Sequence, residues 1–136
     1  MKLKQLFTAY KTLGEAKVTK LEPSEVLKIV KARKAMRPHA ESYEAFLKDC
    51  QEKFKPDMWD EIQAKAQKWD ELSDLEKRGV NTVLTEYNSK INEAVLEELE
   101  KEVELTVEKL NEDSITKILQ ENGWELKKLD ELEVML

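Results

Sequence analysis

A helical pattern runs through residues 24–54, and only Arg33 interrupts it with a charge. Apolar or small side chains recur there at steps of three and four, which places them on one face of an α-helix. These side chains are Val26, Ile29, Val30, Met36, Ala40, Tyr43, Leu47, Cys50 and Phe54. A helix of about 30 residues with one narrow apolar face needs other helices to cover that face, so a helical fold is expected.

Pro38 lies inside this pattern and allows either one helix or two. A proline in a helix interior removes a backbone hydrogen bond and costs about 3 kcal/mol. The apolar phase is nevertheless unbroken across Pro38, whereas a chain that stops and restarts a helix usually loses its phase. We therefore favour one helix over residues 24–54, kinked at Pro38, over two separate helices.

A second long helix is predicted over residues 74–100. Ser73 and Glu76 have the spacing of a capping box, which marks a helix start. The apolar stripe that follows consists of Val80, Val83, Leu84, Tyr87, Ile91, Ala94, Val95 and Leu99. At 1.5 Å per residue, each long helix spans about 40 Å. The two can pack antiparallel with coiled-coil-like contacts.

Shorter helices are expected before and between the two long ones. Residues 3–13 carry one apolar stripe, and Gly14 is expected to end or weaken that helix. Residues 57–72 carry another stripe, and Asp57 is a candidate N-cap because its carboxylate can accept from the first free backbone N–H groups.

The C-terminal part of the chain holds another short helix and an apolar tail. Asn111 and the polar residues after it offer caps, and Gly123 is expected to end the helix. Apolar residues then recur at helical intervals to Leu136. The segment 112–136 therefore has to pack on the long helices or on a partner.

Residues 102–108 change the period of the pattern. Polar and apolar side chains alternate there, which is typical of a half-buried β-strand. No second strand of equal clarity is present, and an isolated strand is not stable. Three interpretations remain open: a strand paired with another chain, a strand with a weak partner in this chain, and a continuation of the preceding helix.

These elements together predict a mainly all-α fold in a single domain over residues 1–136. The expected architecture is an antiparallel helical bundle with long, coiled-coil-like helices. One short β segment near residues 102–108 is compatible with it.

The sequence predicts no catalytic, cofactor-binding or metal-binding residue. One histidine, His39, and one cysteine, Cys50, cannot supply the three or four nitrogen and sulfur ligands of a usual zinc site. The three glycines are far apart, so no phosphate-binding loop is present. Cys50 is interpreted as a small apolar residue on a helix face.

The net charge of −6 conceals an asymmetry along the chain. Residues 1–40 hold 10 Lys and Arg against 3 acids, whereas residues 41–136 hold 13 against 26. One basic stretch is a candidate phosphate-binding patch on a helix. Its members are Lys28, Lys31, Arg33, Lys34 and Arg37. The acidic stretch 93–113 can pair with these bases in the same chain or in a second copy, and we favour such pairing over nucleic-acid binding.

Tryptophans and the C-terminal tail are the candidate contacts for a protein partner. A core position is the default interpretation for each tryptophan, but an exposed one is a strong interface anchor. The candidate interaction residues are Trp59, Trp69, Trp124, Leu129, Leu132 and Met135.

No secretory signal or membrane span is predicted. The basic start of the chain is not followed by an apolar run of about 7–15 residues. No apolar run approaches the roughly 18 residues that would indicate a membrane span. We therefore expect a cytoplasmic protein, or one that ends in a particle assembled in the cytoplasm.

Several segments occur in a recognisable order. They are Met1-Lys2-Leu3-Lys4, Lys28 to Pro38, Tyr43-Glu44-Ala45, Val103-Glu104-Leu105-Thr106-Val107 and Leu129 to Leu136. In this order the chain resembles a family of small uncharacterised proteins from bacteriophages and prophages. The resemblance spans most of the chain but not residues 57–80. It implies a helical protein of phage origin and carries over no catalytic residue.

These features predict a non-enzymatic protein-protein interaction or assembly factor, such as a phage accessory or structural protein. Self-association into a homo-oligomer through the helical seams is expected. The alternative is a nucleic-acid-associated regulator that uses the basic stretch Lys28–Arg37.

Overall fold

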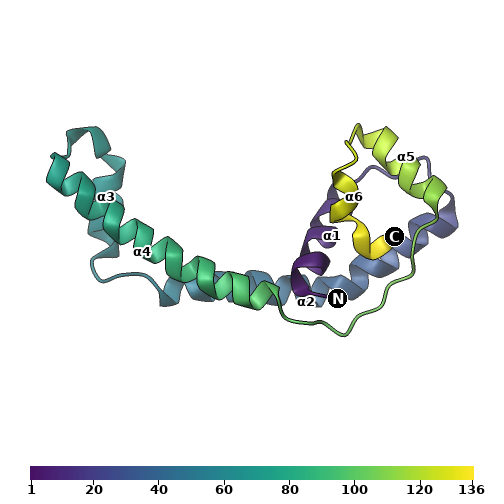
Figure 1. The fold of residues 1–136 in the computed structure, drawn as a ribbon, viewed down its shortest axis with the longest axis horizontal. Coiled ribbons are helices and arrows are strands. Elements are labelled where there is room, and N and C mark those ends of the chain that lie inside the picture. Colours follow the sequence, from purple (N-terminus) through teal and green to yellow (C-terminus); the bar gives the residue numbers. More distant parts are fainter. The chain divides into compact units, whose positions relative to one another are not determined.

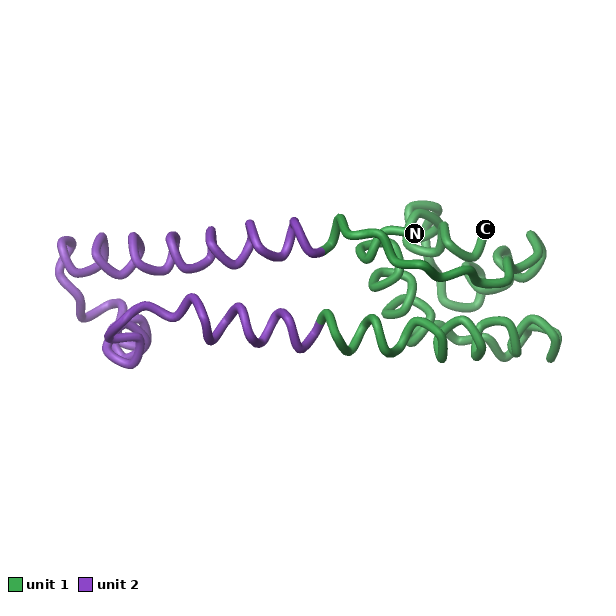
Figure 2. The backbone as a smooth tube through the Cα atoms, turned by 90° about the horizontal axis from the view of Figure 1, so that it is seen from below, with its two compact units in different colours: residues 1–43, 99–136 green, residues 44–98 purple.

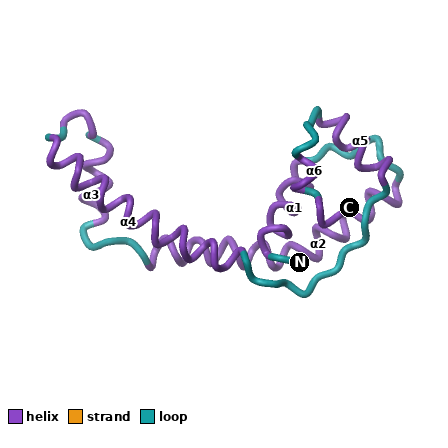
Figure 3. Tube along the Cα trace, in the orientation of Figure 1, coloured by secondary structure: helices purple, strands orange, loops and turns teal.

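The computed structural model describes residues 1–136 and shows an all-α protein (Figure 1). Its helices are α1 (Leu3–Glu15), α2 (Pro23–Lys53), α3 (Trp59–Gln67), α4 (Asp74–Leu99), α5 (Glu112–Asn122) and α6 (Lys128–Glu131). Two short 3₁₀ turns are also present, η1 (Trp69–Glu71) and η2 (Glu133–Met135). No β-strand is formed (Figure 3), so the predicted all-α class is confirmed. None of the helices combines the length and the apolar character that a membrane-spanning segment requires.

The two long helices follow the predicted bounds closely. The helix α2 is continuous across Pro38, as its unbroken apolar phase predicts. Ser73 caps α4 in the predicted way: the Ser73 hydroxyl oxygen accepts a hydrogen bond from the Glu76 backbone N–H at 3.2 Å. The Glu76 carboxylate in turn accepts from the Ser73 backbone N–H at 3.4 Å. Local sequence signals therefore determine where both long helices lie.

The chain forms two compact units (Figure 2). Unit 1 comprises residues 1–43 and 99–136, and unit 2 comprises residues 44–98. The helix α2 contributes residues to both units. The sequence pattern predicts one domain over residues 1–136, whereas the contacts of the chain group into two units.

Unit 1 holds nearly all of the buried apolar side chains. They are Leu3, Leu6, Ala9, Leu13, Leu21, Ile29, Ala32, Met36, Ala40, Tyr43, Leu110, Ile115, Ile118, Leu132 and Met135. The helix α1 packs against α6 and η2, so the first helix and the last turns of the chain share one core.

The C-terminal tail is covered by its own chain. Leu132 and Met135 both have an exposed fraction of 0%. They are candidate partner contacts in a tail that was expected to pack on the long helices or on a partner, but the packing of α1 on η2 makes them core residues of unit 1. Leu129 is half-buried and Leu136 remains exposed.

The segment 102–108 is neither a strand nor a continuation of α4. The helix α4 ends at Leu99, and the backbone beyond it is extended without pairing regularly. One antiparallel bridge joins Lys2 to Glu102. The alternating pattern left a strand and a continued helix open, and neither forms, because no neighbouring segment is long enough to complete a two-stranded ladder.

The side chains of this extended segment explain the alternation. Val103, Leu105 and Val107 are half-buried, whereas the residues between them are exposed. The segment is held at its far end by the Leu110 backbone N–H, which donates to the Met135 carbonyl at 2.8 Å. It therefore covers one side of unit 1 without joining a sheet.

Unit 2 is a helical hairpin built from the last part of α2, α3, η1 and α4 (Figure 2). The Tyr87 hydroxyl on α4 donates to the Gln51 carbonyl of α2 at 3.1 Å. The rings of Trp59 and Tyr87 lie 4.5 Å apart between centroids. These contacts show which face of α4 points toward α2.

The start of α3 differs from its prediction. Met58, with φ 65°, occupies the N-cap position, and no side chain caps the helix. Asp57 is therefore not the N-cap, because the left-handed backbone at Met58 shifts the helix start by one residue. The predicted helical stretch 57–72 is divided between α3 and η1.

Candidate functional site

Two of the five predicted basic-patch residues, Lys28 and Arg33, form contacts with other residues of unit 1. The Lys28 ammonium lies 2.8 Å from the Glu25 carboxylate. The Arg33 guanidinium stacks over the Tyr10 ring at 4.5 Å, and its Nε donates to the Tyr10 carbonyl at 3.4 Å. A Cβ added at Gly14 would lie only 2.8 Å from Arg33, so the glycine makes room for the guanidinium.

The other three basic residues face solvent. Lys31, Lys34 and Arg37 are exposed on α2 and form no ion pair. Leu27 and Val30 are exposed on the same side of the helix, because 27, 30, 34 and 37 follow each other at steps of three and four. The exposed basic patch therefore contains three of the five predicted residues, and exposed apolar side chains lie beside them.

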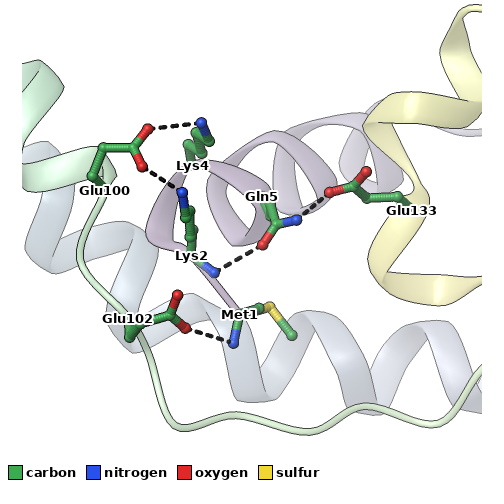
Figure 4. A network of polar contacts seen from close by, with 7 residues as sticks. All are labelled: Met1, Lys2, Lys4, Gln5, Glu100, Glu102 and Glu133. Atoms are coloured by element: carbon green, nitrogen blue, oxygen red, sulfur yellow. Dashed lines mark hydrogen bonds and ion pairs between the residues drawn. The ribbon is translucent and has the colours of Figure 1, made fainter.

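Part of the acidic stretch 93–113 is neutralised by the N-terminal residues, as Figure 4 shows. The Glu100 carboxylate lies 2.6 Å from the Lys2 ammonium and 2.7 Å from that of Lys4. These two cations hold the pKa of Glu100 at about 2, Lys2 contributing most. Gln5 also donates to Glu133. All of these side chains lie at the surface and fasten chain segments together, so they are not arranged as a catalytic group.

Glu25 is the one buried carboxylate of the chain. Its Oε1 accepts hydrogen bonds from the Asn111 backbone N–H and from the Ser114 hydroxyl, both at 2.8 Å. Its Oε2 pairs with Lys28. The hydrogen bond from Lys28, and then that from Asn111, lowers the pKa of Glu25 to about 2. The carboxylate is therefore ionised and fully engaged in joining α2 to α5.

Sequence reasoning did not single out Glu25. It lies in the first turn of a helix, where acids are common, and two of its three partners, Asn111 and Ser114, are more than 80 positions away. Only Asn111 gave a local signal: its predicted role as a cap is confirmed, since its side chain accepts from the Ser114 N–H at 2.7 Å.

No group of three or more His, Cys, Asp or Glu side chains is placed so that it could hold a metal ion. Cys50 is a buried free thiol on α2. This agrees with its interpretation as a small apolar residue of a helix face.

The three tryptophans are all half-buried. Trp59 packs against Tyr87 inside unit 2. The Trp69 ring lies beneath the Lys77 ammonium at 5.7 Å, and the Trp124 ring lies beneath that of Lys128 at 5.1 Å. None is fully exposed, and Trp124 lines an open hollow beside α5.

An apolar groove runs along α5 in unit 1. Its volume is about 420 Å³, and its lining consists of Leu110, Glu112, Ile115, Thr116, Leu119, Leu126, Leu129 and Leu136. A second hollow shares Thr116, Leu119 and Leu126 and adds Trp124. Leu126 has an exposed fraction of 77%. Of the predicted interaction residues, Leu129 lines the groove and Trp124 lines the second hollow.

Unit 2 leaves most of its large apolar side chains only partly covered. Only Cys50 and Val80 are buried between residues 44 and 98. Twelve further large apolar side chains are half-buried, namely Phe46, Leu47, Phe54, Trp59, Ile62, Trp69, Leu72, Val83, Leu84, Tyr87, Ile91 and Val95. Met58, Leu75 and Leu96 are exposed.

Comparison with known proteins gives no relative from which a role could be transferred. No family model matches the chain, and no curated protein or solved structure is significantly similar to it.

Proposed function

We propose that this chain is a non-enzymatic protein-interaction or assembly factor that associates with copies of itself through helical surfaces. The burial of unit 2 carries this proposal. Two long helical segments meet there, yet only two side chains, Cys50 and Val80, are removed from solvent. By contrast, unit 1 buries fifteen apolar side chains.

A two-helix hairpin has a physical reason to associate. Each helix covers only one side of its neighbour, so the apolar stripes remain half open along their length. Four helices enclose such stripes completely, and two hairpins supply four helices. Each square ångström of apolar surface removed from water contributes about 25 cal/mol. Association of two copies of unit 2 therefore has a favourable source of free energy that the single chain leaves unused.

Sedimentation equilibrium over a hundredfold range of protein concentration tests the proposal. We expect a molar mass that is a multiple of the single-chain value and that falls on dilution. A mass equal to one chain throughout, together with no cross-linked product, would contradict it.

The same proposal includes a role as a phage or prophage accessory or structural protein in the host cytoplasm. Its support is the resemblance of segment order described above. The neighbouring genes test it directly: capsid or tail genes beside this one are expected, and a setting of housekeeping genes would speak against it.

A second candidate function is that of a nucleic-acid-associated regulator. The exposed and unpaired Lys31, Lys34 and Arg37 favour it. Binding through phosphates is strong at low salt and falls steeply as salt rises. Labelled DNA and RNA should then bind at about 50 mM salt and be released near 200 mM. Replacing all three bases by Glu should abolish binding, whereas the matched triple change at Lys65, Lys68 and Lys90 should not. No binding of the unaltered protein at the lower salt would exclude this function.

A further inference from the structure

The extended segment that follows α4 leaves most of its backbone hydrogen-bonding groups unpaired. The backbone N–H and carbonyl groups of Glu104 and of residues 106–108 have no partner in the chain. The Leu105 N–H is engaged only locally, since it donates to the Val103 carbonyl at 3.0 Å. A row of unpaired backbone groups on an extended chain is a template with which a further strand can pair.

The chain itself shows which kind of strand this segment accepts. Residues 1–4 alternate apolar and basic side chains, Met-Lys-Leu-Lys. The first three of them lie antiparallel to the beginning of the segment, where the Val103 N–H donates to the Met1 carbonyl at 2.8 Å. Their two lysines pair with the Glu100 carboxylate (Figure 4). This pairing reaches Val103 and leaves residues 104–108 open.

An open hollow of about 460 Å³ lies beside the unpaired part of the segment. It is lined by Leu105, Thr106 and Val107 of the segment, and by Gln5 of α1 and Val134 of η2. Leu105 and Val107 are half-buried, so part of their apolar surface is still open. An added strand therefore has space next to the backbone and an apolar surface for every second side chain. Packing against the helices of unit 1 supplies the support that two strands alone lack.

The charges of the segment select the partner. Glu102, Glu104 and Glu108 are exposed, and no basic residue lies among residues 102–108. Neither Glu104 nor Glu108 forms an ion pair within the chain. If two such segments paired antiparallel about Leu105, Glu102 would face Glu108, and like charges directly opposite each other destabilise paired strands. The segment therefore disfavours a second copy of itself and favours a basic strand.

We propose that residues 104–108 bind an extended peptide of a partner protein, in which apolar side chains alternate with Lys or Arg. The peptide adds as a strand, and its backbone pairs with the open backbone of the segment. Its apolar side chains share one face with Leu105 and Val107, and its cations share the other face with Glu104 and Glu108. This interaction goes beyond the proposed self-association, which rests on unit 2.

Fluorescence anisotropy of a labelled synthetic octapeptide tests the proposal on the full chain. The probe alternates valine and lysine, and we expect it to show saturable binding. A peptide of the same composition with its lysines grouped at one end should bind at least about tenfold more weakly, because its apolar side chains no longer share one face. A peptide that alternates valine and glutamate should not bind.

Methylation of the probe backbone distinguishes strand addition from attraction between charges alone. In an added strand, alternate amides face the neighbouring strand and the others face away. N-methylation of the amides that face the segment should therefore abolish binding. N-methylation of the other alternate set should change the dissociation constant less than about threefold, because those amides make no contact with the segment. Two methylated probes that bind equally would overturn strand addition.

Charge reversal on the protein tests the location. Glu104→Lys/Glu108→Lys should raise the dissociation constant of the valine–lysine probe at least about tenfold. Glu93→Lys/Glu97→Lys makes the same change of charge at exposed positions of α4, so it is the matched control and should leave binding within about threefold of the original. Circular dichroism verifies that both variants are folded.

Two results would overturn the proposal. One is equal binding of the probe by the two double variants. The other is the absence of saturable binding to the unaltered protein at up to about 1 mM probe. Sedimentation of the protein without the probe measures self-association separately, so the failure of either proposal can be recognised without the other.

Discussion

The Ser114 hydroxyl donates a hydrogen bond of 2.8 Å to the Glu25 carboxylate across 89 positions of sequence, and both side chains are buried. The same carboxylate oxygen accepts from the Asn111 backbone N–H, just before α5. One buried acid thus connects the first turn of α2 to the start of α5. The contact therefore joins two segments of unit 1 that lie far apart in the sequence.

Replacing Glu25 should therefore destabilise unit 1. In Glu25→Gln the carboxylate that accepts from Asn111 and Ser114 becomes a neutral amide, and Lys28 loses its ion pair. Hydrogen bonds to a charged group contribute more than neutral ones, so we expect the free energy of unfolding to fall by about 1–3 kcal/mol. Urea denaturation followed by circular dichroism measures the change. Glu41→Gln, an exposed acid on the same helix, is the control and should alter stability by less than about 0.5 kcal/mol.

The stabilisation from Glu25 should depend on pH. Its pKa is lowered from an ordinary value of 4.5 to about 2 by Lys28 and Asn111. A lowered pKa means that the folded state favours the ionised carboxylate, so the contribution is complete above pH 4.5 and is lost as the pH falls toward 2. The difference in unfolding free energy between the original protein and Glu25→Gln should shrink over that interval. A difference that stays constant from pH 7 to pH 2.5 would show that the charge of Glu25 contributes nothing.

Two leucines near the C-terminus should respond very differently to truncation. Leu132 is fully buried, so Leu132→Ala leaves a cavity and should cost about 2–5 kcal/mol. Leu126 is 77% exposed, and Leu126→Ala should cost less than about 0.5 kcal/mol. Thermal and urea unfolding of the two variants provide the comparison. Equal losses would mean that Leu126 is covered in solution by another molecule.

Two glycines should change stability in opposite directions when replaced by alanine. Gly123 ends α5 with φ 63°, a left-handed conformation that an alanine adopts only with strain, so Gly123→Ala should lower stability by about 1 kcal/mol. Gly79 lies inside α4 with open space around it, so Gly79→Ala should raise stability by up to about 1 kcal/mol. Melting temperatures in one buffer test both. A destabilising Gly79→Ala would indicate that another chain lies close to that position.

The long helices could be predicted from sequence because their signals are local. The apolar phase across Pro38 and the capping box at Ser73 involve residues only a few positions apart, and both predictions are confirmed. The end of α5 at Gly123 followed from the same kind of signal.

Features that depend on distant residues could not be predicted in this way. Nothing near Glu25 indicates that residues 111 and 114 supply its partners. The alternation in 102–108 suggested a strand that does not form, and it carried no information about the neighbouring segment, which is residues 1–3. Leu132 and Met135 lie in a tail for which the local sequence indicates no cover, because the helix that covers them, α1, is more than 100 positions away in the sequence.

The closure of unit 1 has a consequence for the order in which the protein forms during synthesis. Its core joins residues of α1 to Leu132 and Met135, whereas unit 2 is built from the continuous stretch of residues 44–98. On the ribosome, the hairpin can therefore assemble while the rest of the chain is still being translated. The apolar side chains of α1 that pack on η2 stay uncovered until residues 133–135 have also been synthesised, so the nascent chain exposes aggregation-prone apolar surface during that interval.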